Sequence, residues 1–328
     1  NILIIGSGGR ENSLAWIIEK NELVKKIYII PGNAGSEKIK KCKRINLDIY
    51  DKKELINKLQ FLDINLIVIG PEDPLSKGLG DYLRDNGFNV FGPGADGAKL
   101  ESSKSWAKEF MNEGNIPTAK FWKVNSIDKA KEIIVSSPDP LVVKADGLAS
   151  GKGVFIPNSK DECLEATKSI LNGKFGDAGQ IVVLEEKIKG PEVSVFAICD
   201  GKRYLLLPTA QDHKRLNEND EGPNTGGMGA YSPTPLITKS YLERIKKEII
   251  QPTIDGLINK NIEYRGVIYF GLMITQSGPK VIEYNCRFGD PECQTIMPLM
   301  DQNFVFLLEK CSMGNLTGDE KINISDKF

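Results

Sequence analysis

The sequence predicts an α/β and α+β protein that has a doubly wound parallel sheet at its N-terminus, then a small flap lobe and a larger central lobe. Short apolar strands alternate with amphipathic helices over residues 1–100, which is typical of a doubly wound sheet. Long strands and a hairpin after residue 190 indicate an antiparallel sheet. Because 328 residues exceed what one hydrophobic core usually serves, we expect separate lobes at residues 1–118, 119–190 and 191–328.

The N-terminal lobe is predicted to contain four short strands, each running into a glycine-bearing loop. Helical spacing of apolar residues at 14–18 and 55–59 indicates the helices between them. Ligands of such sheets bind beyond the carboxyl ends of the strands, where backbone amides and helix N-termini favour anions. Although one glycine can simply make a turn, four such loops together predict a phosphate-bearing ligand. The strands are residues 1–5, 27–30, 65–69 and 89–91, and the loops are 6–9, 31–35, 70–73 and 92–94.

Two common enzyme classes are disfavoured by single residues. Gly6 and Gly8 begin a dinucleotide-binding pattern, but Glu11 stands where its third glycine belongs, which argues against a nicotinamide oxidoreductase. His213 is the only histidine, so a histidine-rich metal site cannot be built. Reactions driven by ATP and magnesium need few proton-shuttling residues, because positioning and charge neutralisation supply most of the catalysis.

Composition bounds the partners and the compartment. The chain has 43 basic and 44 acidic residues and a formal net charge of -1, so we expect no nucleic-acid or membrane partner. Its six cysteines are scattered without metal or redox spacing, which favours reduced thiols. The apolar start shows no targeting signal and no long apolar stretch follows, so we expect a cytoplasmic protein.

The flap lobe is predicted to carry a phosphate-binding loop. Residues 142–154 mix lysines with glycines after a strand, so backbone amides can wrap phosphates while lysines neutralise them. It is not a Walker loop, because Gly147 and Gly151 are one residue too close and Gly153 replaces the Ser or Thr. A solvated hairpin is the alternative. The expected elements are strands 141–145, 154–156 and 181–186 and a helix near 160–171.

In the central lobe, period-two geometry places Glu283, Asn285 and Arg287 on one face of a strand spanning Val281–Phe288. A carboxylate, an amide and a guanidinium in line suit a magnesium-bridged phosphate beside a carboxylate substrate, with structural salt bridging as the alternative. The other expected elements are strands 192–199 and 204–207, an irregular glycine-rich stretch at 212–231, a helix at 239–259, and strand 266–274 paired with 280–288.

Seven motifs in order along nearly the whole chain carry a family resemblance. They are Gly8–Glu11, Pro31–Gly35, Gly70–Leu75, Lys144–Val154, Gln211–Lys214, Gly222–Tyr231 and Asn285–Glu292. With them the sequence resembles the glycinamide ribonucleotide synthetase family of the ATP-grasp superfamily. The resemblance implies ATP bound between the flap and central lobes. It also implies ligation of glycine to 5-phosphoribosylamine through glycyl phosphate, with Mg²⁺ or Mn²⁺ as cofactor.

The resemblance also implies roles for particular residues. Lys104 and Lys144 would bind phosphates, and a covering loop would include Gly147, Ser150, Gly151, Lys152 and Gly153. Glu185, Glu186 and Glu192, which without the resemblance could be ordinary surface acids, would serve the adenine and ribose end. Glu283 and Asn285 match the metal ligands.

For the other substrates we assign residues by hypothesis. Arg287 would hold the glycine carboxylate and Asp212 its ammonium group, so that Lys144, Arg287 and Asp212 form the catalytic set. Gly8, Gly9, Glu72 and Asp73 would receive the phosphoribosyl group.

Three features depart from the family pattern. Asn12 stands where a histidine is common, residues 269–273 offer no second metal carboxylate, and the family's further small lobe is not expected before Phe328. Fusion to, or association with, other purine-pathway domains is expected. The alternatives are another ATP-grasp carboxylate-amine ligase of purine metabolism, using formate or bicarbonate, and a nucleotide-binding regulatory module without turnover.

Overall fold

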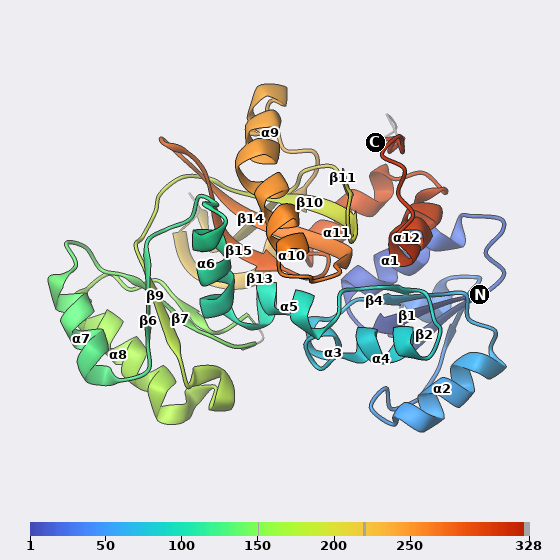
Figure 1. Cartoon of the computed structure of the whole chain (residues 1–328), viewed down its shortest axis with the longest axis horizontal. Coiled ribbons are helices and arrows are strands. Elements are labelled where there is room, and N and C mark those ends of the chain that lie inside the picture. The colour runs from blue at the N-terminus through green and yellow to red at the C-terminus, as the bar shows by residue number, and fades with distance from the viewer. Residues whose placement is uncertain (150, 219–220, 325–328) are drawn as a thin grey trace.

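The computed structural model describes residues 1–149, 151–218 and 221–324, and it places three larger sheets and one two-stranded ribbon among them. Figure 1 shows the N-terminal sheet at one end, the flap lobe at the other, and the central lobe between them. The α/β and α+β fold predicted from the sequence is confirmed. None of the helices within the described ranges is long and apolar enough to cross a membrane.

The N-terminal sheet is entirely parallel, in the order β3-β2-β1-β4-β5. β1 and β4 are buried throughout, which explains their unbroken runs of apolar residues. The chain order reverses between β1 and β4, so the ligand crevice of such a sheet lies at the ends of these two strands. The elements are β1 (Ile2–Gly6), α1 (Gly9–Glu19), β2 (Ile27–Pro31), β3 (Cys42–Arg44), α2 (Lys52–Phe61), β4 (Leu66–Ile69), α3 (Glu72–Ser76), α4 (Leu79–Asp85) and β5 (Val90–Phe91).

Two helices connect this sheet to the flap lobe, whose antiparallel sheet has the order β6-β9-β7-β8. Ser103 begins the second helix, because its side chain accepts a hydrogen bond from the Trp106 amide. The connecting helices are α5 (Ala95–Ser102) and α6 (Lys104–Glu113). The flap contains β6 (Phe121–Val124), α7 (Ile127–Ser136), β7 (Val142–Ala145), β8 (Val154–Phe155), α8 (Lys160–Ser169) and β9 (Val182–Glu185).

The central lobe has an antiparallel sheet in the order β11-β10-β14-β15. The helix expected at 239–259 is present and continues through a π-helical turn at Lys246–Ile250. The elements are β10 (Glu192–Asp200), β11 (Tyr204–Leu206), α9 (Lys239–Ile245), α10 (Gln251–Asn259), β14 (Arg265–Thr275), β15 (Gly278–Asn285), α11 (Glu292–Ile296) and α12 (Phe304–Met313).

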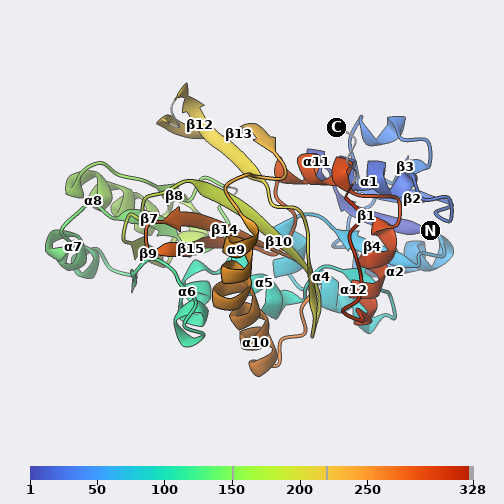
Figure 2. The ribbon, with the colours of Figure 1, turned by 90° about the horizontal axis from the view of Figure 1, so that it is seen from above.

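The glycine-rich stretch expected to be irregular instead forms a ribbon of two antiparallel strands. β12 (Gln211–Asn217) pairs with β13 (Glu221–Tyr231), with register shifts at 213–217. Glycine and asparagine have low strand propensity and show no alternation here, so the sequence carries no strand signal; backbone pairing holds the ribbon. In Figure 2 the ribbon extends away from the central sheet.

The strand that carries Glu283 is shorter than predicted. It ends at Asn285, whose partner is Tyr269, and the chain then leaves the sheet toward α11. Glu283 and Asn285 do share one face, but Arg287 lies beyond the strand. Its direction is set by ion pairs instead of by the period of the strand.

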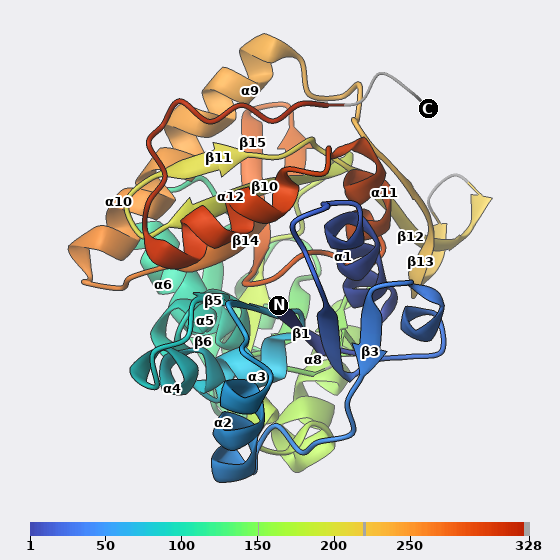
Figure 3. The ribbon, with the colours of Figure 1, turned by 90° about the vertical axis from the view of Figure 1, so that its right-hand side faces the viewer.

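The N-terminal sheet and the central lobe share their hydrophobic cores, whereas the flap has a core of its own. Leu3 and Ile5 of β1 belong to the same buried cluster as Phe270 of β14. Ile2 and Ile4, on the opposite face of β1, belong to a second buried cluster together with Phe304 of α12. Figure 3 shows α1, α11 and α12 close together on this side. The flap cluster includes Val143 and contains only residues of that lobe.

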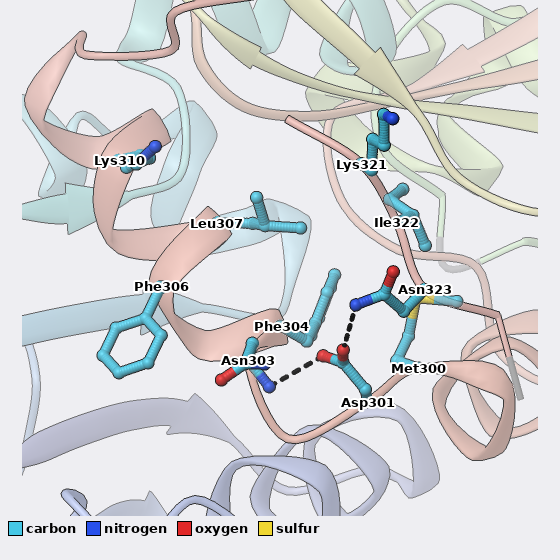
Figure 4. A pocket seen from close by; sticks show the side chains of 10 residues that line it. All are labelled: Met300, Asp301, Asn303, Phe304, Phe306, Leu307, Lys310, Lys321, Ile322 and Asn323. Atoms are coloured by element: carbon cyan, nitrogen blue, oxygen red, sulfur yellow. Dashed lines mark hydrogen bonds between the residues drawn. The ribbon is translucent and has the colours of Figure 1, made fainter. Parts of the chain in front are cut away.

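A pocket of about 140 Å³ lies beside α12, where the C-terminal segment crosses that helix. Figure 4 shows Asn323 donating a hydrogen bond to Asp301 (2.8 Å) across it. None of the sequence-predicted site residues lines this pocket, so the candidate site lies elsewhere.

Candidate active site

Lys144 and Lys104 approach the junction of the flap and central lobes from different elements. Lys144 lies on β7, and its Nζ donates to the carbonyl oxygen of Ile282 on β15 at 3.0 Å. Lys104 begins α6, and its Nζ donates to the carbonyl oxygens of Asp146 (3.4 Å) and Gly147 (3.1 Å). Burial, followed by repulsion from Lys144, lowers the pKa of Lys104.

Glu185, at the end of β9, joins the lysines into a buried ionic chain. Its two oxygens lie 2.8 Å from Lys144 Nζ and 2.8 Å from Lys108 Nζ. Burial alone would raise the pKa of Glu185, but the two lysines outweigh it and the pKa lies below its ordinary value. Two lysines thus pair with one carboxylate, and Lys104 lies near enough to Lys144 to be repelled by it, so this region can take up the negative charge of a polyphosphate.

The loop between β7 and β8 packs closely where it leaves the strands. A Cβ at Gly147 would meet Ala178 at 2.8 Å, and one at Gly153 would meet Ala149 at 2.7 Å, so both positions need glycine. Gly151 has φ +74° and Lys152 is exposed. Ser150 lies outside the described residues.

Glu283 is the residue on which the site converges. Burial raises the pKa of its carboxyl, but four cations, led by Lys214, outweigh this and lower it; the others are Lys144, Arg287 and Lys104. Lys214 of β12 lies 3.7 Å from Glu283 Oε1 and 3.6 Å from Glu192 Oε2.

Space for Glu283 depends on its neighbour across the sheet. Gly271 of β14 pairs with Glu283, and a Cβ there would meet Glu283 Cγ at 2.9 Å. Asn285 lies two residues further along on the same face of β15.

Asp212 has a buried oxygen that is ready to accept a hydrogen bond. Within the described part of the chain, nothing donates to its Oδ1. Burial, followed by the charge of Glu292, raises the pKa of Asp212 to about 6. A cationic ligand placed here would lower that pKa and satisfy the oxygen.

Arg287 lies between two carboxylates from other parts of the chain. Its Nε is 3.2 Å from Glu72 Oε2 and its Nη2 is 2.8 Å from Glu101 Oε1, while Nη1 donates to the Phe288 carbonyl at 3.2 Å. Glu101 also accepts from the Cys286 amide at 2.8 Å. Burial raises the pKa of Glu101, and the positive charge of Arg287 opposes this shift. Through its two ion pairs, the Arg287 guanidinium joins the N-terminal lobe, α5 and the central lobe.

At the carboxyl ends of β1 and β4, Glu11 fills the crevice between the strands. Its Oε2 accepts from the Gly8 amide at 2.7 Å, and its Oε1 pairs with Arg10 at 2.7 Å. A Cβ at Gly70 would meet the Glu11 Cδ at 2.6 Å. Gly9 approaches the central lobe so closely that a Cβ would meet Gln294 at 2.5 Å. The residue that breaks the dinucleotide pattern thus caps α1.

Two predicted residues point elsewhere. Asp73 is exposed and contacts Lys77 (2.9 Å) and Tyr50. Glu186 is exposed, and its amide donates to the Lys120 carbonyl. The roles proposed for them stay predictions.

The structure also adds charged residues that the sequence analysis did not select. Lys108 stands four residues after Lys104, a helical spacing that could have indicated it. Lys214 and Glu292 end two of the seven motifs, but the motifs alone assigned them no role. Glu101 meets Arg287 only through long-range packing and left no local signal.

Comparisons with known proteins identify the family. The family model of the phosphoribosylglycinamide synthetase N domain matches residues 1–101, and that of the phosphoribosylglycinamide synthetase ATP-grasp (A) domain matches residues 102–293. The chain belongs to this family. The family resemblance that the seven motifs indicated is therefore confirmed, and the site described above is that of a phosphoribosylglycinamide synthetase family member.

Individual relatives agree with this membership. The phosphoribosylamine–glycine ligase of Mesorhizobium japonicum is 45% identical over 316 residues, covering 96% of this chain and 74% of that protein. The trifunctional purine biosynthetic protein adenosine-3 of Drosophila pseudoobscura pseudoobscura is 46% identical over 321 residues. The match covers 96% of this chain but only 24% of the length of that protein. The crystal structure of the Thermotoga maritima phosphoribosylamine–glycine ligase matches with TM-score 0.81 and 33% identity, over 96% of this chain and 76% of that one.

Proposed function

We propose that this phosphoribosylglycinamide synthetase joins glycine to 5-phosphoribosylamine, using ATP and releasing ADP and phosphate, with glycyl phosphate as the intermediate. Family membership and the similarity to the phosphoribosylamine–glycine ligases of Mesorhizobium japonicum and Thermotoga maritima support the assignment. The observation that carries it is the convergence of cations from the flap, α6 and the central lobe on Glu283. Such a site favours a polyphosphate next to a carboxylate-bound metal.

In this proposal the nucleotide lies along the lysine-rich junction. Lys104 and Lys144 neutralise phosphate charge, and backbone amides of the β7–β8 loop cover the phosphates. The excess positive charge beside Glu185 supports this placement. The acids assigned to the adenine and ribose end are Glu185, Glu186 and Glu192.

Glu283 and Asn285 would hold Mg²⁺ or Mn²⁺. Both offer oxygen atoms from one face of β15, and no described residue lies closer to the Glu283 carboxylate in an ion pair than Lys214 at 3.7 Å. Such a donor pair fits magnesium, which usually takes few protein ligands and keeps water and phosphate oxygens. When bound, the ion would neutralise charge that develops on the phosphates.

The remaining groups orient the two other substrates. Arg287 has N–H groups left over after its three contacts, and these can receive the glycine carboxylate; the buried oxygen of Asp212 can receive the ammonium group. The loops at Gly8, Gly9, Glu72 and Asp73 would receive the phosphoribosyl group.

Once oriented, the glycine carboxylate attacks the γ-phosphate and the amine of phosphoribosylamine then displaces phosphate to form the amide. Lys144 and Lys104 stabilise the charge that develops on the transferred group. The residues thus act mainly by positioning and neutralisation.

We also infer that the reaction takes place in the cytoplasm and that the chain works fused to, or together with, other purine-pathway domains. The thiols of all six cysteines are free, as expected in a reducing compartment. The trifunctional relatives support a fused arrangement.

ADP release from the purified chain tests the proposal. Mg-ATP, glycine and freshly generated phosphoribosylamine are supplied together, then each is omitted in turn and alanine replaces glycine. We expect ADP only when both glycine and phosphoribosylamine are present. ADP formed with formate or bicarbonate instead would indicate another ATP-grasp ligase, and ATP binding without any ADP would indicate a regulatory module.

A further inference from the structure

Lys108 is a buried lysine whose place in the fold suggests more than a structural ion pair. It lies one helical turn after Lys104 on α6, so both side chains leave the same side of the helix. The Lys108 side chain is 3% exposed, and its Nζ donates to Thr118 Oγ1 at 2.7 Å in addition to the ion pair with Glu185. Burial lowers the pKa of Lys108 to about 8, and the charge of Glu185 opposes this shift.

The contacts around Lys108 fix the carboxylate of Glu185 from two sides. Lys108 faces one oxygen and Lys144 faces the other, each at 2.8 Å. Both lysines are in turn anchored on β15, because Thr118 Oγ1 donates to the Val281 carbonyl at 2.7 Å and Lys144 to that of Ile282 at 3.0 Å.

A carboxylate held in this way acts only as a hydrogen-bond acceptor. With a cation on each oxygen, Glu185 stays ionised and its plane cannot rotate, yet each oxygen keeps a lone pair for another donor. It can accept a hydrogen bond in a set direction and cannot donate one. A buried group of this kind discriminates strongly between ligands that donate to it and ligands that do not.

Adenine and hypoxanthine differ in the relevant group. The 6-amino group of adenine donates hydrogen bonds, whereas the 6-oxo group of hypoxanthine only accepts them. An oxo group facing the fixed carboxylate would leave two acceptors opposed and unpaired.

We propose that Lys108 is a positioning residue that holds Glu185 as a fixed hydrogen-bond acceptor, so that the nucleotide site selects a 6-amino purine over a 6-oxo purine. The inference rests on the proposed function, which places Glu185 at the adenine end. It adds a specificity role for a lysine that does not itself touch the nucleotide.

The test measures dissociation constants of ATP and inosine triphosphate by calorimetry with Mg²⁺, in the absence of glycine and phosphoribosylamine. Wild type is compared with Lys108→Met, Lys108→Arg and Thr118→Val. Lys123→Met serves as the control, because Lys123 is a surface lysine paired with Glu109 at 3.2 Å.

We expect wild type to prefer ATP by about tenfold or more, since the hydrogen bond involves a charged group. Lys108→Met should narrow this preference by about tenfold, mainly by weakening ATP binding, because Glu185 can then rotate or take up a proton. Lys108→Arg should restore much of the preference, Thr118→Val should narrow it less, and Lys123→Met should leave it unchanged.

The outcomes separate the inference from the function on which it rests. A folded wild type that binds no ATP overturns the proposed function. Two results overturn only the role of Lys108: a wild type that binds ATP and inosine triphosphate equally well, or a folded Lys108→Met variant that still prefers ATP as strongly as wild type. If circular dichroism shows that Lys108→Met is unfolded, Thr118→Val decides: a narrowed preference supports the inference and an unchanged one overturns it.

Discussion

The two charged clusters of the site are built with opposite balance. At the lysine-rich junction, Lys108 and Lys144 pair with the single carboxylate of Glu185, and Lys104 stands close to Lys144. At the other cluster, the single cation Arg287 is flanked by Glu72 and Glu101. Counted by these ion pairs, the first cluster has positive charge left over for an anionic ligand, whereas the second has an excess of carboxylates and its one cation is already paired within the chain.

This difference indicates that the clusters do different work. The junction is prepared to bind phosphate, because a nucleotide completes its charge balance. The Arg287 cluster joins three parts of the fold, and a substrate carboxylate there must share the guanidinium with Glu72. Arg287 should thus affect stability and glycine binding together, and the lysines should affect ATP chemistry with less effect on stability.

The largest effect is expected on breaking the Arg287 cluster. Arg287→Ala leaves Glu101, whose side chain is 8% exposed, without its cation, and we expect a loss of about 3–5 kcal/mol in the free energy of unfolding. Urea unfolding measures this. The double variant Arg287→Ala, Glu101→Gln should recover a part of the loss; if it recovers none, the pair is not the cause.

Glycine binding by Arg287 needs a milder variant, because instability would obscure it. Arg287→Lys keeps the charge but loses the forked geometry, so we expect the glycine KM to rise about tenfold while the ATP KM stays the same. Steady-state kinetics at saturating phosphoribosylamine checks this. An unchanged glycine KM would remove Arg287 from that role.

At the lysine junction the expected effect is on turnover. Lys144→Met removes a cation from the transferring phosphate and should lower kcat by about 10²- to 10³-fold. Single-turnover ADP formation measures it, and circular dichroism checks that the variant is folded. A variant with near-normal kcat would mean that Lys144 serves only to hold Glu185.

The pH dependence of glycine binding tests Asp212. Its pKa is raised to about 6, so above that pH the carboxylate is charged and attracts the ammonium group, and below it the charge is lost. We expect the glycine KM to rise about tenfold for each pH unit below 6. Glu292→Gln removes a negative charge that raises the pKa of Asp212, so the rise in glycine KM should begin at a lower pH in this variant. The pH dependence of the ATP KM serves as the control.

The smallest effect is expected at an exposed pair. Lys123 and Glu109 lie 3.2 Å apart with side chains more than one third exposed. Lys123→Met should therefore change the free energy of unfolding by less than about 1 kcal/mol. A larger change would show that stability differences at Arg287 are not specific to its buried cluster.

Local sequence signals predicted much of this fold. Apolar runs and the glycines after them placed strands such as β1 and β4 to within one residue, since buried parallel strands must be continuously apolar. The β12–β13 ribbon escaped prediction, because backbone pairing between glycine-rich strands leaves no periodic pattern.

The candidate site was predictable where its residues lie close together in sequence. Glu283 and Asn285 followed from strand period, and the β7–β8 loop from its lysines and glycines. The partner of Arg287 could not be found in this way, because Glu72 is 215 residues away and meets it only through the shared packing of two lobes. Glu11 was missed for a different reason: it caps Gly8 only three residues away, but a glycine at the N-cap lacks the Ser or Thr that marks a capping box in a sequence.

The separate core of the flap has an energetic consequence. Because the other two lobes share their buried clusters, they should unfold together, while the flap can open as its own cooperative unit. A nucleotide that contacts both the flap and β15 must then bind more tightly to the closed form than to the open one. Part of its binding free energy goes into ordering the flap, and slower amide exchange across β7 and β9 would record that coupling.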